Sequence, residues 1–520
     1  MIKIKIYDTT LRDGTQGEEV SLSSHEKMMI AQELDNIGFD YIEGGWPGSN
    51  ARDREFFQKA RSYKFKHSKL AAFSMTRRKN FRAEEDANMQ ELLAAETPVV
   101  TIVGKSWDLH ATLVLKADLE ENLKMIYDTI KFFKDKGREV IFDAEHYFDG
   151  FISNKDYAIK TLKKAEEAGA SCLVLCDTNG GTMPDDLTKI INETKKYVKT
   201  DLGIHCHNDS GLAVANSIIA VENGINHVQG TINGIGERTG NSDILTIIAN
   251  LQLKKGFDCI PEKDIKKLKH ISRFVYETMN LIPNKAQPYV GESAFAHKGG
   301  MHADAVSKDP KTYEHIEPEK IGNIRRILAS DLSGKSNIIS KSKEFGIDLN
   351  DDESKEITKI VKDMENKGYN YEAADASLYL LMLKHKKSYN PLFKTEKFKV
   401  TTERINDKDV NLAVLVLKIK DSIVESNSDG NGPVDALNKA LRKILEKFYP
   451  ELRKIHLTDF KVRIVDGNKA TESTTRVLIE SSDSEKFWTT VGVSNDIITA
   501  SYEALVEGIE YGLMHLKDSI

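Results

Sequence analysis

SCLVLCDTNGGTMPDDLTKIINET, residues 171–194, is one copy of the unit that decides the fold. A short apolar run typical of a buried strand leads into a polar loop and then a helical pattern. That pattern opens on Pro184, a residue favoured in the first turn of a helix. The same strand–loop–helix plan recurs through residues 1–255. It predicts eight strands, at residues 2–7, 41–44, 69–73, 99–103, 139–143, 171–176, 202–206 and 227–231.

Strict alternation of strands and helices predicts a parallel sheet covered by helices. Helical patterns at residues 117–136, 156–168 and 241–255 lie between or after the strands, and Ser23 with Glu26 forms a capping-box pattern. Eight units in about 250 residues favour an α/β fold of the closed (β/α)8 TIM-barrel type. An open doubly wound sheet is the alternative. It is less favoured because polar residues follow predicted strands throughout the series of eight, rather than at one point of it.

The alternation stops after the eighth unit. Residues 276–395 are charged and helical, as in 341–367 and 371–383, and we expect a helical subdomain that contributes to the active site. In residues 396–520 the segments VLVLKIKD…GNGPVDALNKAL and RVLIESSD…GVSNDIITASYEAL share a plan of strand, loop and helix. They predict a pseudo-duplicated βββα domain of the α+β class. Two coincidentally similar hairpin–helix units are the alternative. The expected domains are therefore 1–275, 276–395 and 396–520.

The composition excludes several classes of function. The net charge is −6 with acids and bases interspersed, so no basic stripe is available for nucleic acid or an anionic membrane. No run approaches the ~20 apolar residues that span a bilayer, and MIKIKIYDTT at the N-terminus is unlike a signal peptide. Four cysteines in 520 residues make no disulfide framework, which favours a reducing cytoplasm.

Two strand ends carry residue types that suit a metal. The first strand ends in YDTTLRDGTQ, residues 7–16, which crowds Arg12, Asp13 and Gln16 where barrel active sites lie, whereas a helix cap would need only one polar residue. In HCHND, His205 and His207 are two apart on a strand and face the same side. With Asp13 they offer two nitrogens and a carboxylate, a set that suits Zn, Mn, Fe or Co, and with more water ligands also Mg.

Other strand ends add polar groups, although acids at a barrel rim can also serve only to satisfy loop amides. Strand two ends at Glu43, strand five ends in FDAEH and strand six ends in CDTN. The loop TINGIGERTGN, residues 231–241, is a weak dinucleotide fingerprint because it follows the last strand, but a phosphate or CoA contact there is plausible. In AHKGGMHADAV, His302 and Asp304 would share one side of an extended segment; a polar turn is an equal interpretation.

These motifs together resemble the DRE-TIM metallolyases, the family of 2-isopropylmalate, homocitrate and citramalate synthases and hydroxymethylglutaryl-CoA lyase. DTTLRDGTQ, HCHND, GIGERTGN and GGMHADAV match the synthase branch in order. The stretch VDGNKATESTTRVLIES…WTTVGVSNDIITASYEALVEGIEY resembles the allosteric dimer domain of that branch. The resemblance implies an acyltransferase that uses acetyl-CoA, a 2-oxoacid and a divalent metal (Mn, Mg or Zn).

The family's residue roles carry over onto matching positions. The metal ligands implied are Asp13, His205 and His207, with Asn241 in or near the coordination sphere. The implied substrate-binding and catalytic residues are Arg12, which contacts the keto oxygen, Thr178, which holds the oxoacid carboxylate, Gln16 and Asp143 beside the substrate, Glu145 next to the reacting carbons, and His302 with Tyr313 from the subdomain. Either Glu145 or His302 is expected to be the base, because a methyl group beside a thioester is a weak carbon acid. In synthases of this family that subdomain can reach the partner subunit's site.

IEGGWPGSN, residues 42–50, is similar to one group of citramalate synthases, which implies pyruvate as the oxoacid in a route to isoleucine. Trp46 could narrow the site for a methyl-sized side chain, or could anchor a loop away from it. 2-Isopropylmalate or homocitrate synthesis is the nearest alternative. A lyase is disfavoured because Glu237, Arg238 and Thr239 stand where hydroxymethylglutaryl-CoA lyases carry a Cys. An inactive amino-acid sensor is disfavoured by the intact metal set.

The last domain implies a homodimer and inhibition by an amino acid. Isoleucine is the effector expected for a citramalate synthase, and leucine for an isopropylmalate synthase. A domain that only dimerises, without regulation, is the alternative, because allostery requires differential binding between two states. Neither a nucleic-acid partner nor a membrane partner is expected.

Overall fold

The structure is a computed structural model that describes residues 2–328, 335–386, 389–465, 473–483 and 486–517. Two compact units make up the chain: Met1–Phe295 with Ile316–Ile324, and Ala296–His315 with Arg325–Ile520. Each unit is described by itself. Within the described residues, no helix is both long enough and apolar enough to cross a membrane.

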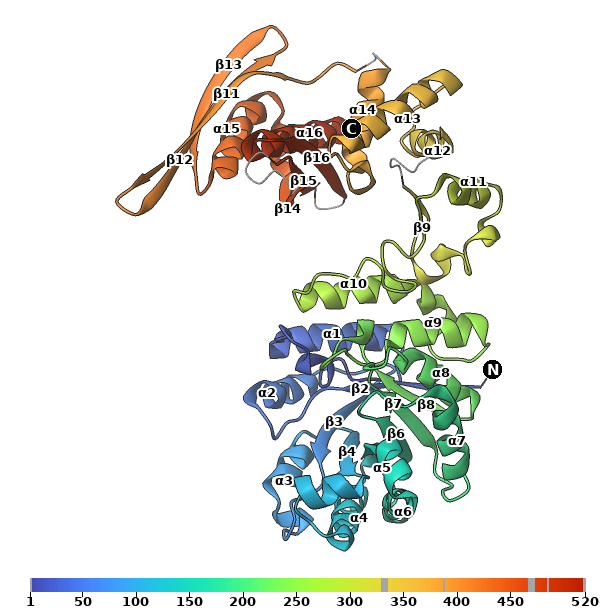
Figure 1. The fold of residues 1–520 in the computed structure, drawn as a ribbon. Coiled ribbons are helices and arrows are strands. Elements are labelled where there is room, and N and C mark those ends of the chain that lie inside the picture. Colours follow the sequence, from blue (N-terminus) through green and yellow to red (C-terminus); the bar gives the residue numbers. More distant parts are fainter. Residues whose placement is uncertain (1, 329–334, 387–388, 466–472, 484–485, 518–520) are drawn as a thin grey trace. The chain divides into compact units, whose positions relative to one another are not determined.

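The first unit contains a closed barrel of eight parallel strands in chain order (Figure 1). The strands are β1 Lys5–Asp8, β2 Tyr41–Glu43, β3 Lys69–Met75, β4 Val99–Lys105, β5 Glu139–Glu145, β6 Cys172–Asp177, β7 Leu202–Cys206 and β8 His227–Gly230. Because β1 pairs with both β2 and β8, the barrel closes. All eight predicted strands are present, so the barrel is confirmed and the open sheet is excluded.

Helices surround the barrel, as alternating β and α units require (Figure 1). They are α1 Ser24–Ile37, α2 Ala51–Ala60, α3 Ala87–Ala94, α4 Leu119–Asp135, α5 Tyr147–Ser153, α6 Lys155–Ala168, α7 Pro184–Thr194, α8 Ala213–Glu222, α9 Ile244–Lys254 and α10 Leu268–Thr278. The capping box at Ser23 and Glu26 is formed at the start of α1, and Pro184 begins α7 as predicted. The apolar faces of these helices and the outward faces of the strands share one continuous core.

The barrel interior is filled by side chains rather than open. Tyr7 and Tyr41, register partners on neighbouring strands, lie there with Val99, Ile141 and Val174. All four cysteines of the chain are buried free thiols, in line with the predicted absence of a disulfide framework. Because side chains fill the interior, the active site of such a barrel lies at the rim formed by the carboxyl ends of the strands.

The second unit begins with four α-helices and two strands of two residues each. They are β9 Ala296–His297, α11 Gly300–Lys308, β10 Arg326–Ile327, α12 Lys335–Glu344, α13 Asp351–Asn366 and α14 Asp375–His385. Residues 341–367, predicted to be helical, contain the end of α12 and the whole of α13. Gly346 adopts a left-handed backbone (φ +68°) between the two helices, and a second capping box, of Asn350 and Glu353, starts α13. AHKGGMHADAV is not an extended segment, since His302 lies on α11.

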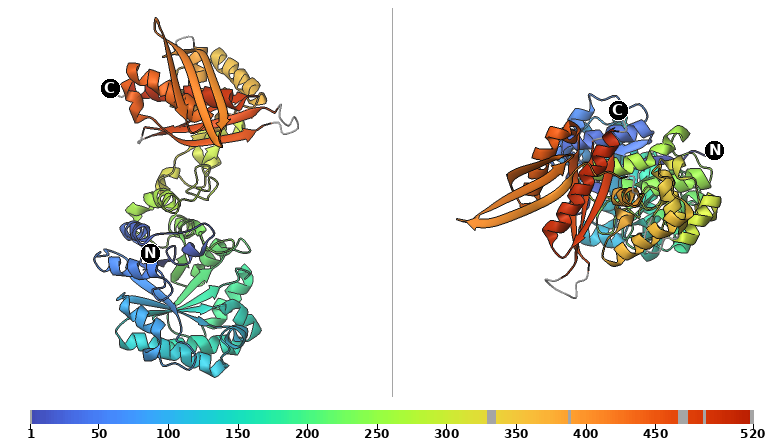
Figure 2. Two further views of the ribbon diagram at one scale, coloured as in Figure 1. Left: turned by 90° about the vertical axis from the view of Figure 1, so that its left-hand side faces the viewer. Right: turned by 90° about the horizontal axis from the view of Figure 1, so that it is seen from above.

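The rest of the second unit contains two copies of one βββα plan. The elements are β11 Lys394–Ile405, β12 Lys408–Ile419, β13 Ser422–Gly430 and α15 Pro433–Phe448, then β14 His456–Ile464, β15 Thr475–Ser482, β16 Phe487–Ser494 and α16 Ile497–Lys517. Each trio is an antiparallel sheet in chain order, packed against the helix that follows it (Figure 2). The predicted duplication is confirmed, while residues 466–472 of its VDGNKATE motif lie outside the described part. The boundaries at 275 and 395 stay a prediction.

Candidate active site and metal centre

A cavity of about 250 Å3 opens at the carboxyl ends of the barrel strands. Its lining residues lie on, or directly follow, all eight strands. They are Arg12, Asp13, Gln16, Trp46, Phe73, Met75, Val103, Lys105, Asp143, Glu145, Cys176, Thr178, His205, His207, Glu237 and Arg238. The folded barrel therefore gathers residues that are more than 200 positions apart into one site.

Asp13, His205 and His207 form the one group among the described residues whose nitrogen and carboxylate atoms are close enough to share a metal ion. Nε2 of His205 lies 3.2 Å from Oδ2 of Asp13. The two imidazole rings are 5.1 Å apart between centroids, as the spacing of two along a strand requires. All three side chains are buried, so solvation by bulk water does not account for three polar groups that lie this close together.

The protonation states of Asp13 and His207 suit a cation. At His205, burial alone would lower the pKa, but the hydrogen bond to Asp13 outweighs it and raises that pKa, so a metal ion would have to displace a proton there. Burial alone would raise the pKa of the Asp13 carboxyl, but the charge of Arg12 and the hydrogen bond from His205 outweigh it and hold that pKa below its ordinary value. Burial, and then the charge of His205, lowers the pKa of His207 to about 4. An ionised carboxylate and a neutral imidazole are the forms that bind divalent metals.

Asn241 is the backbone neighbour of His207. The two residues pair in an isolated bridge, and the side-chain Oδ1 of Asn241 is buried without a hydrogen-bond partner among the described residues. A side chain at Gly236 would collide with the amide of Asn241, so the glycine allows the loop to close over it. A buried carbonyl oxygen without a partner, on a residue paired with His207, is suited to bind a cation, and the donor set of the site fits a divalent metal.

Arg12 is held rigidly at the rim by two contacts. Its Nε donates to Oε2 of Glu43 at 2.6 Å, and its guanidinium lies over the ring of Phe73, 3.9 Å from the centroid. Glu43 is fully buried and also accepts hydrogen bonds from Tyr7 and Thr9. An arginine fixed on one side by a buried carboxylate presents its remaining N–H groups in a set direction.

Asp143 differs from the other carboxylates of the site. Burial, and then the charge of Glu43, raises the pKa of Asp143 to about 7. Nε2 of Gln229 donates to its Oδ1 at 3.0 Å. Asp143 therefore takes up a proton near neutral pH. This is unusual for carboxyl groups in general, but common for those in active sites.

Glu145 and Thr178 are set by their neighbours at the ends of β5 and β6. The ammonium of Lys105 is paired with Oε2 of Glu145. The hydroxyl of Thr178 accepts from the backbone N–H of His146 at 2.8 Å. His146 adopts a left-handed backbone (φ +54°), and such strain is frequent where a site requires one fixed geometry.

Most predicted site residues converge on this cavity. Arg12, Asp13, Gln16, Asp143, Glu145, Thr178, His205 and His207 line it, and Asn241 pairs with His207. His302 and Tyr313 belong to the second unit, where their rings stack with centroids 4.1 Å apart. Their part in the barrel site stays a prediction.

Five other residues line the cavity without having been predicted as site residues from the sequence: Phe73, Met75, Val103, Lys105 and Cys176. Glu43 was noted as a strand end but was given no role. Lys105 carries the signal used for the other strands, a polar residue at the end of an apolar run, but the predicted strand stopped at Val103. Trp46 lines the cavity and packs edge-on against Phe73, with centroids 5.9 Å apart, which favours the interpretation that it narrows the site.

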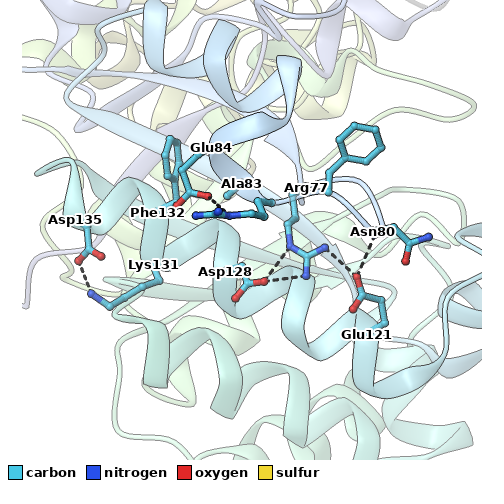
Figure 3. Close-up of a pocket in the computed structure, with 11 residues that line it drawn as sticks. Arg77, Asn80, Ala83, Glu84, Glu121, Asp128, Lys131, Phe132 and Asp135 are labelled. Carbon is cyan, nitrogen blue, oxygen red and sulfur yellow. Dashed lines mark hydrogen bonds and ion pairs between the residues drawn. The ribbon is translucent and has the colours of Figure 1, made fainter.

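A larger hollow, of about 460 Å3, lies beside α4 and the segment after β3, and contains none of the predicted site residues (Figure 3). Its charged side chains pair with one another: Arg77 with Glu121 and Asp128, and Lys131 with Asp135. Because these charges are already neutralised within the hollow, we assign it no role in the chemistry.

Comparison with known proteins covers almost the whole chain. Residues 3–275 match the family model HMGL-like, residues 289–369 match homocitrate synthase post-HMGL domain-like, and residues 372–513 match LeuA allosteric (dimerisation) domain. The chain is 50% identical to an (R)-citramalate synthase of Geobacter sulfurreducens, across 100% of this chain and 99% of that protein. It is 51% identical to one of Aquifex aeolicus, across 98% of both. A 2-isopropylmalate synthase of Methanocaldococcus jannaschii is 35% identical, across 98% of this chain and 94% of that protein.

Proposed function

Because the chain belongs to the HMGL-like family, we propose that it is an (R)-citramalate synthase, an acyltransferase that condenses acetyl-CoA with pyruvate and releases CoA. Five relatives of that name are 45–51% identical to it over nearly its whole length, and a 2-isopropylmalate synthase is more distant at 35%. The observation that carries the proposal is the buried group of Asp13, His205 and His207, which lies beside the fixed guanidinium of Arg12.

The oxoacid would bind beside this group. Asp13, His205, His207 and Asn241 would hold a divalent cation, Mn, Mg or Zn, which would act as a Lewis acid on the keto carbonyl. Thr178 holds the carboxylate of the oxoacid with its hydroxyl. Gln16 and Asp143 line the same space.

Arg12 stabilises the alkoxide that forms when the new carbon–carbon bond closes. Its guanidinium keeps its charge at any physiological pH, and Glu43 has oriented it before the substrate arrives. A charge fixed in advance costs no reorganisation when the oxygen becomes negative. Arg12 therefore acts on the transition state rather than only on the bound substrate.

Glu145 removes a proton from the acetyl methyl group, and the resulting carbon nucleophile attacks the keto carbon of pyruvate. Water then cleaves the thioester and releases CoA, which makes the overall reaction effectively irreversible. His302 and Tyr313, stacked on each other in the second unit, complete the site from the partner subunit. His302 is the alternative base.

Aromatic and apolar side chains favour a small oxoacid. Trp46, Phe73, Met75 and Val103 line one cavity of about 250 Å3 with the polar groups. A methyl side chain fits such a space more easily than a branched one. One methylene is worth only about 1–3 kcal/mol in a pocket, so the preference for pyruvate over neighbouring oxoacids is graded.

The second unit makes the enzyme a homodimer that is inhibited by isoleucine, the end product of the route it supplies. Residues 372–513, matched by the dimerisation-domain model, support this part of the proposal. The division into a catalytic domain (1–275), a linker subdomain (276–395) and a regulatory domain (396–520) belongs to it. Four unpaired thiols suit the reducing cytoplasm as its location.

The test is release of CoA from acetyl-CoA, followed with a thiol reagent. Pyruvate, 2-oxobutyrate, 2-oxoisovalerate and 2-oxoglutarate are each supplied with and without a chelator. We expect chelator-sensitive release that is fastest with pyruvate. Faster release with 2-oxoisovalerate or 2-oxoglutarate would instead identify an isopropylmalate or homocitrate synthase, and no release with any of the four would overturn the proposal.

A further inference from the structure

Lys105 and Glu145 are the last residues of two neighbouring strands and form an ion pair inside the active-site cavity. They are register partners in the β4–β5 ladder, and the ammonium of Lys105 is bonded to Oε2 of Glu145. The Lys105 side chain is only 10% exposed and the Glu145 side chain 23%. Asn122 donates to the backbone carbonyl of Lys105 at 2.8 Å, which fixes the end of the strand.

Among the described residues, three basic side chains line the cavity: Arg12, Lys105 and Arg238. The two arginines are already paired with other carboxylates. Arg12 is held by Glu43 and lies beside Asp13. Arg238 forms a bidentate ion pair with Asp209, which does not itself line the cavity. Lys105 is the cation whose partner is Glu145, the residue to which we assign the proton removal.

The proposed reaction generates negative charge on two different oxygens. One is the alkoxide on the former keto carbon, which Arg12 and the metal group face. The other is the thioester oxygen, which becomes negative when the acetyl methyl group loses its proton. A buried enolate oxygen without a positive or hydrogen-bonding partner would be strongly disfavoured, so a donor or cation is needed at the acetyl group.

We propose that Lys105 is a catalytic residue that binds the thioester oxygen of acetyl-CoA and stabilises its enolate; this inference rests on the proposed function. Glu145 takes the proton from the methyl carbon, and the C–H electron pair becomes the C=C bond as the carbonyl pair moves onto the oxygen. The ammonium of Lys105 donates a hydrogen bond to that oxygen. The enolate carbon then attacks the keto carbon, the thioester C=O re-forms, and the charge moves to the alkoxide.

The geometry favours this role over a purely structural ion pair. The ammonium lies next to the base, so an acetyl group held between them would meet Glu145 with its methyl and Lys105 with its oxygen. A lysine suits the task because its ammonium is a compact point charge on a flexible stem, able to turn from the carboxylate to the incoming carbonyl.

The test compares Lys105→Met and Lys105→Arg with wild type, using CoA release in the presence of pyruvate. Loss of an oxyanion partner commonly lowers kcat by 10²–10³-fold, so we expect at least a ~100-fold loss for Lys105→Met and a smaller one for Lys105→Arg. Enolate formation then becomes slower relative to the other steps. The kinetic isotope effect with trideuterated acetyl-CoA should therefore be larger in Lys105→Met than in wild type.

Lys124→Met, at an exposed position on the neighbouring helix α4, is the matched control and should behave as wild type. Metal binding by Lys105→Met reports whether the site remains folded. Normal turnover in Lys105→Met would overturn the assignment. So would a loss of turnover with an unchanged isotope effect, because a structural role lowers activity without changing which step limits it. Failure of wild type to release CoA would instead overturn the proposed function itself.

Discussion

Gln229 accepts a hydrogen bond from Nδ1 of His205, with 2.8 Å between the two heavy atoms. The amide of Gln229 can only be oriented one way, because its Nε2 donates to Oδ1 of Asp143. Its oxygen therefore faces the imidazole, and Nδ1 of His205 carries the hydrogen. In the neutral form of the imidazole, the form that binds a metal, Nε2 of His205 on the side of Asp13 is then the nitrogen without a hydrogen.

We expect Gln229→Met to weaken metal binding by about 10–100-fold, since partners that orient a metal-ligating histidine typically contribute that much. Methionine keeps the length of the side chain but removes both hydrogen bonds. The measurement is a calorimetric titration of the metal-free protein with Mn2+ or Zn2+. Gln58→Met, at an exposed position of α2, is the control. Unchanged affinity in Gln229→Met would show that the hydrogen bond does not set the tautomer.

Glu43 is a second residue that acts through a neighbour, because it orients Arg12. We expect Glu43→Gln to lower kcat about 100-fold with little change in the KM for pyruvate, since the loss falls on the transition state. It also leaves the buried guanidinium short of a counter-charge, so the unfolding midpoint should fall. Steady-state kinetics at two pyruvate concentrations and thermal unfolding check both effects. Glu55→Gln on the surface of α2 is the control, and a normal kcat in Glu43→Gln would contradict the orienting role.

The eight strands could be predicted because each is a short apolar run bounded by polar loops, a local property. The ends of the strands were harder, because a strand continues as long as its neighbour continues to pair with it. β4 and β5 run two residues beyond the predicted ends, and the last pair in their ladder is Lys105 with Glu145. That pairing joins residues 40 apart in sequence, so Lys105 was not recognised as a rim residue.

The closeness of His205 and His207 could be predicted because they are separated by one residue at the end of a strand. The contact of Glu43 with Arg12 could not, because it joins the ends of β2 and β1 only when the barrel has closed. The start of α13 was within reach of the sequence, since Asn350 and Glu353 form a capping box of the kind recognised at Ser23. Residues 341–367 were predicted to be helical from their charge pattern, without the boundary that this capping box marks.

Trp46 is expected to set the preference among oxoacids, since it lines the cavity and packs edge-on against Phe73. Trp46→Ala should raise kcat/KM for 2-oxoisovalerate relative to pyruvate by about 10-fold or more. This factor corresponds to the binding free energy of about one or two methylene groups, for which the variant would have room. The measurement is CoA release with each oxoacid in competition. Phe81→Ala removes a half-exposed aromatic ring that does not line this cavity and should leave the ratio unchanged. No gain on larger oxoacids in Trp46→Ala would show that the tryptophan does not limit the space.

His227, the first residue of β8, is fully buried between the rings of Tyr7 and Tyr41, at centroid distances of 5.3 and 5.6 Å. Neither of its ring nitrogens has a hydrogen-bond partner among the described residues. Burial, and then the charge of Lys5, lowers the pKa of His227 to about 3, while the charge of Asp201 acts in the opposite direction. The folded barrel therefore keeps this imidazole neutral over most of the acidic range.

His227 should make the barrel sensitive to acid. In the unfolded chain its pKa returns to about 6.5, so between pH 6.5 and 3 the unfolded state binds more protons and stability falls as the pH falls. This group alone should cost about 2 kcal/mol of unfolding free energy at pH 5 relative to pH 8. His227→Leu removes that cost, and should also relieve an unsatisfied buried polar group, so the variant should equal or exceed wild type at pH 8 and exceed it clearly at pH 5. Urea unfolding followed by tryptophan fluorescence at the two pH values measures the difference, with His67→Asn, an exposed histidine of the same unit, as the control. An equal loss of stability between pH 8 and pH 5 in wild type and His227→Leu would show that the buried imidazole does not limit the acid stability of the barrel.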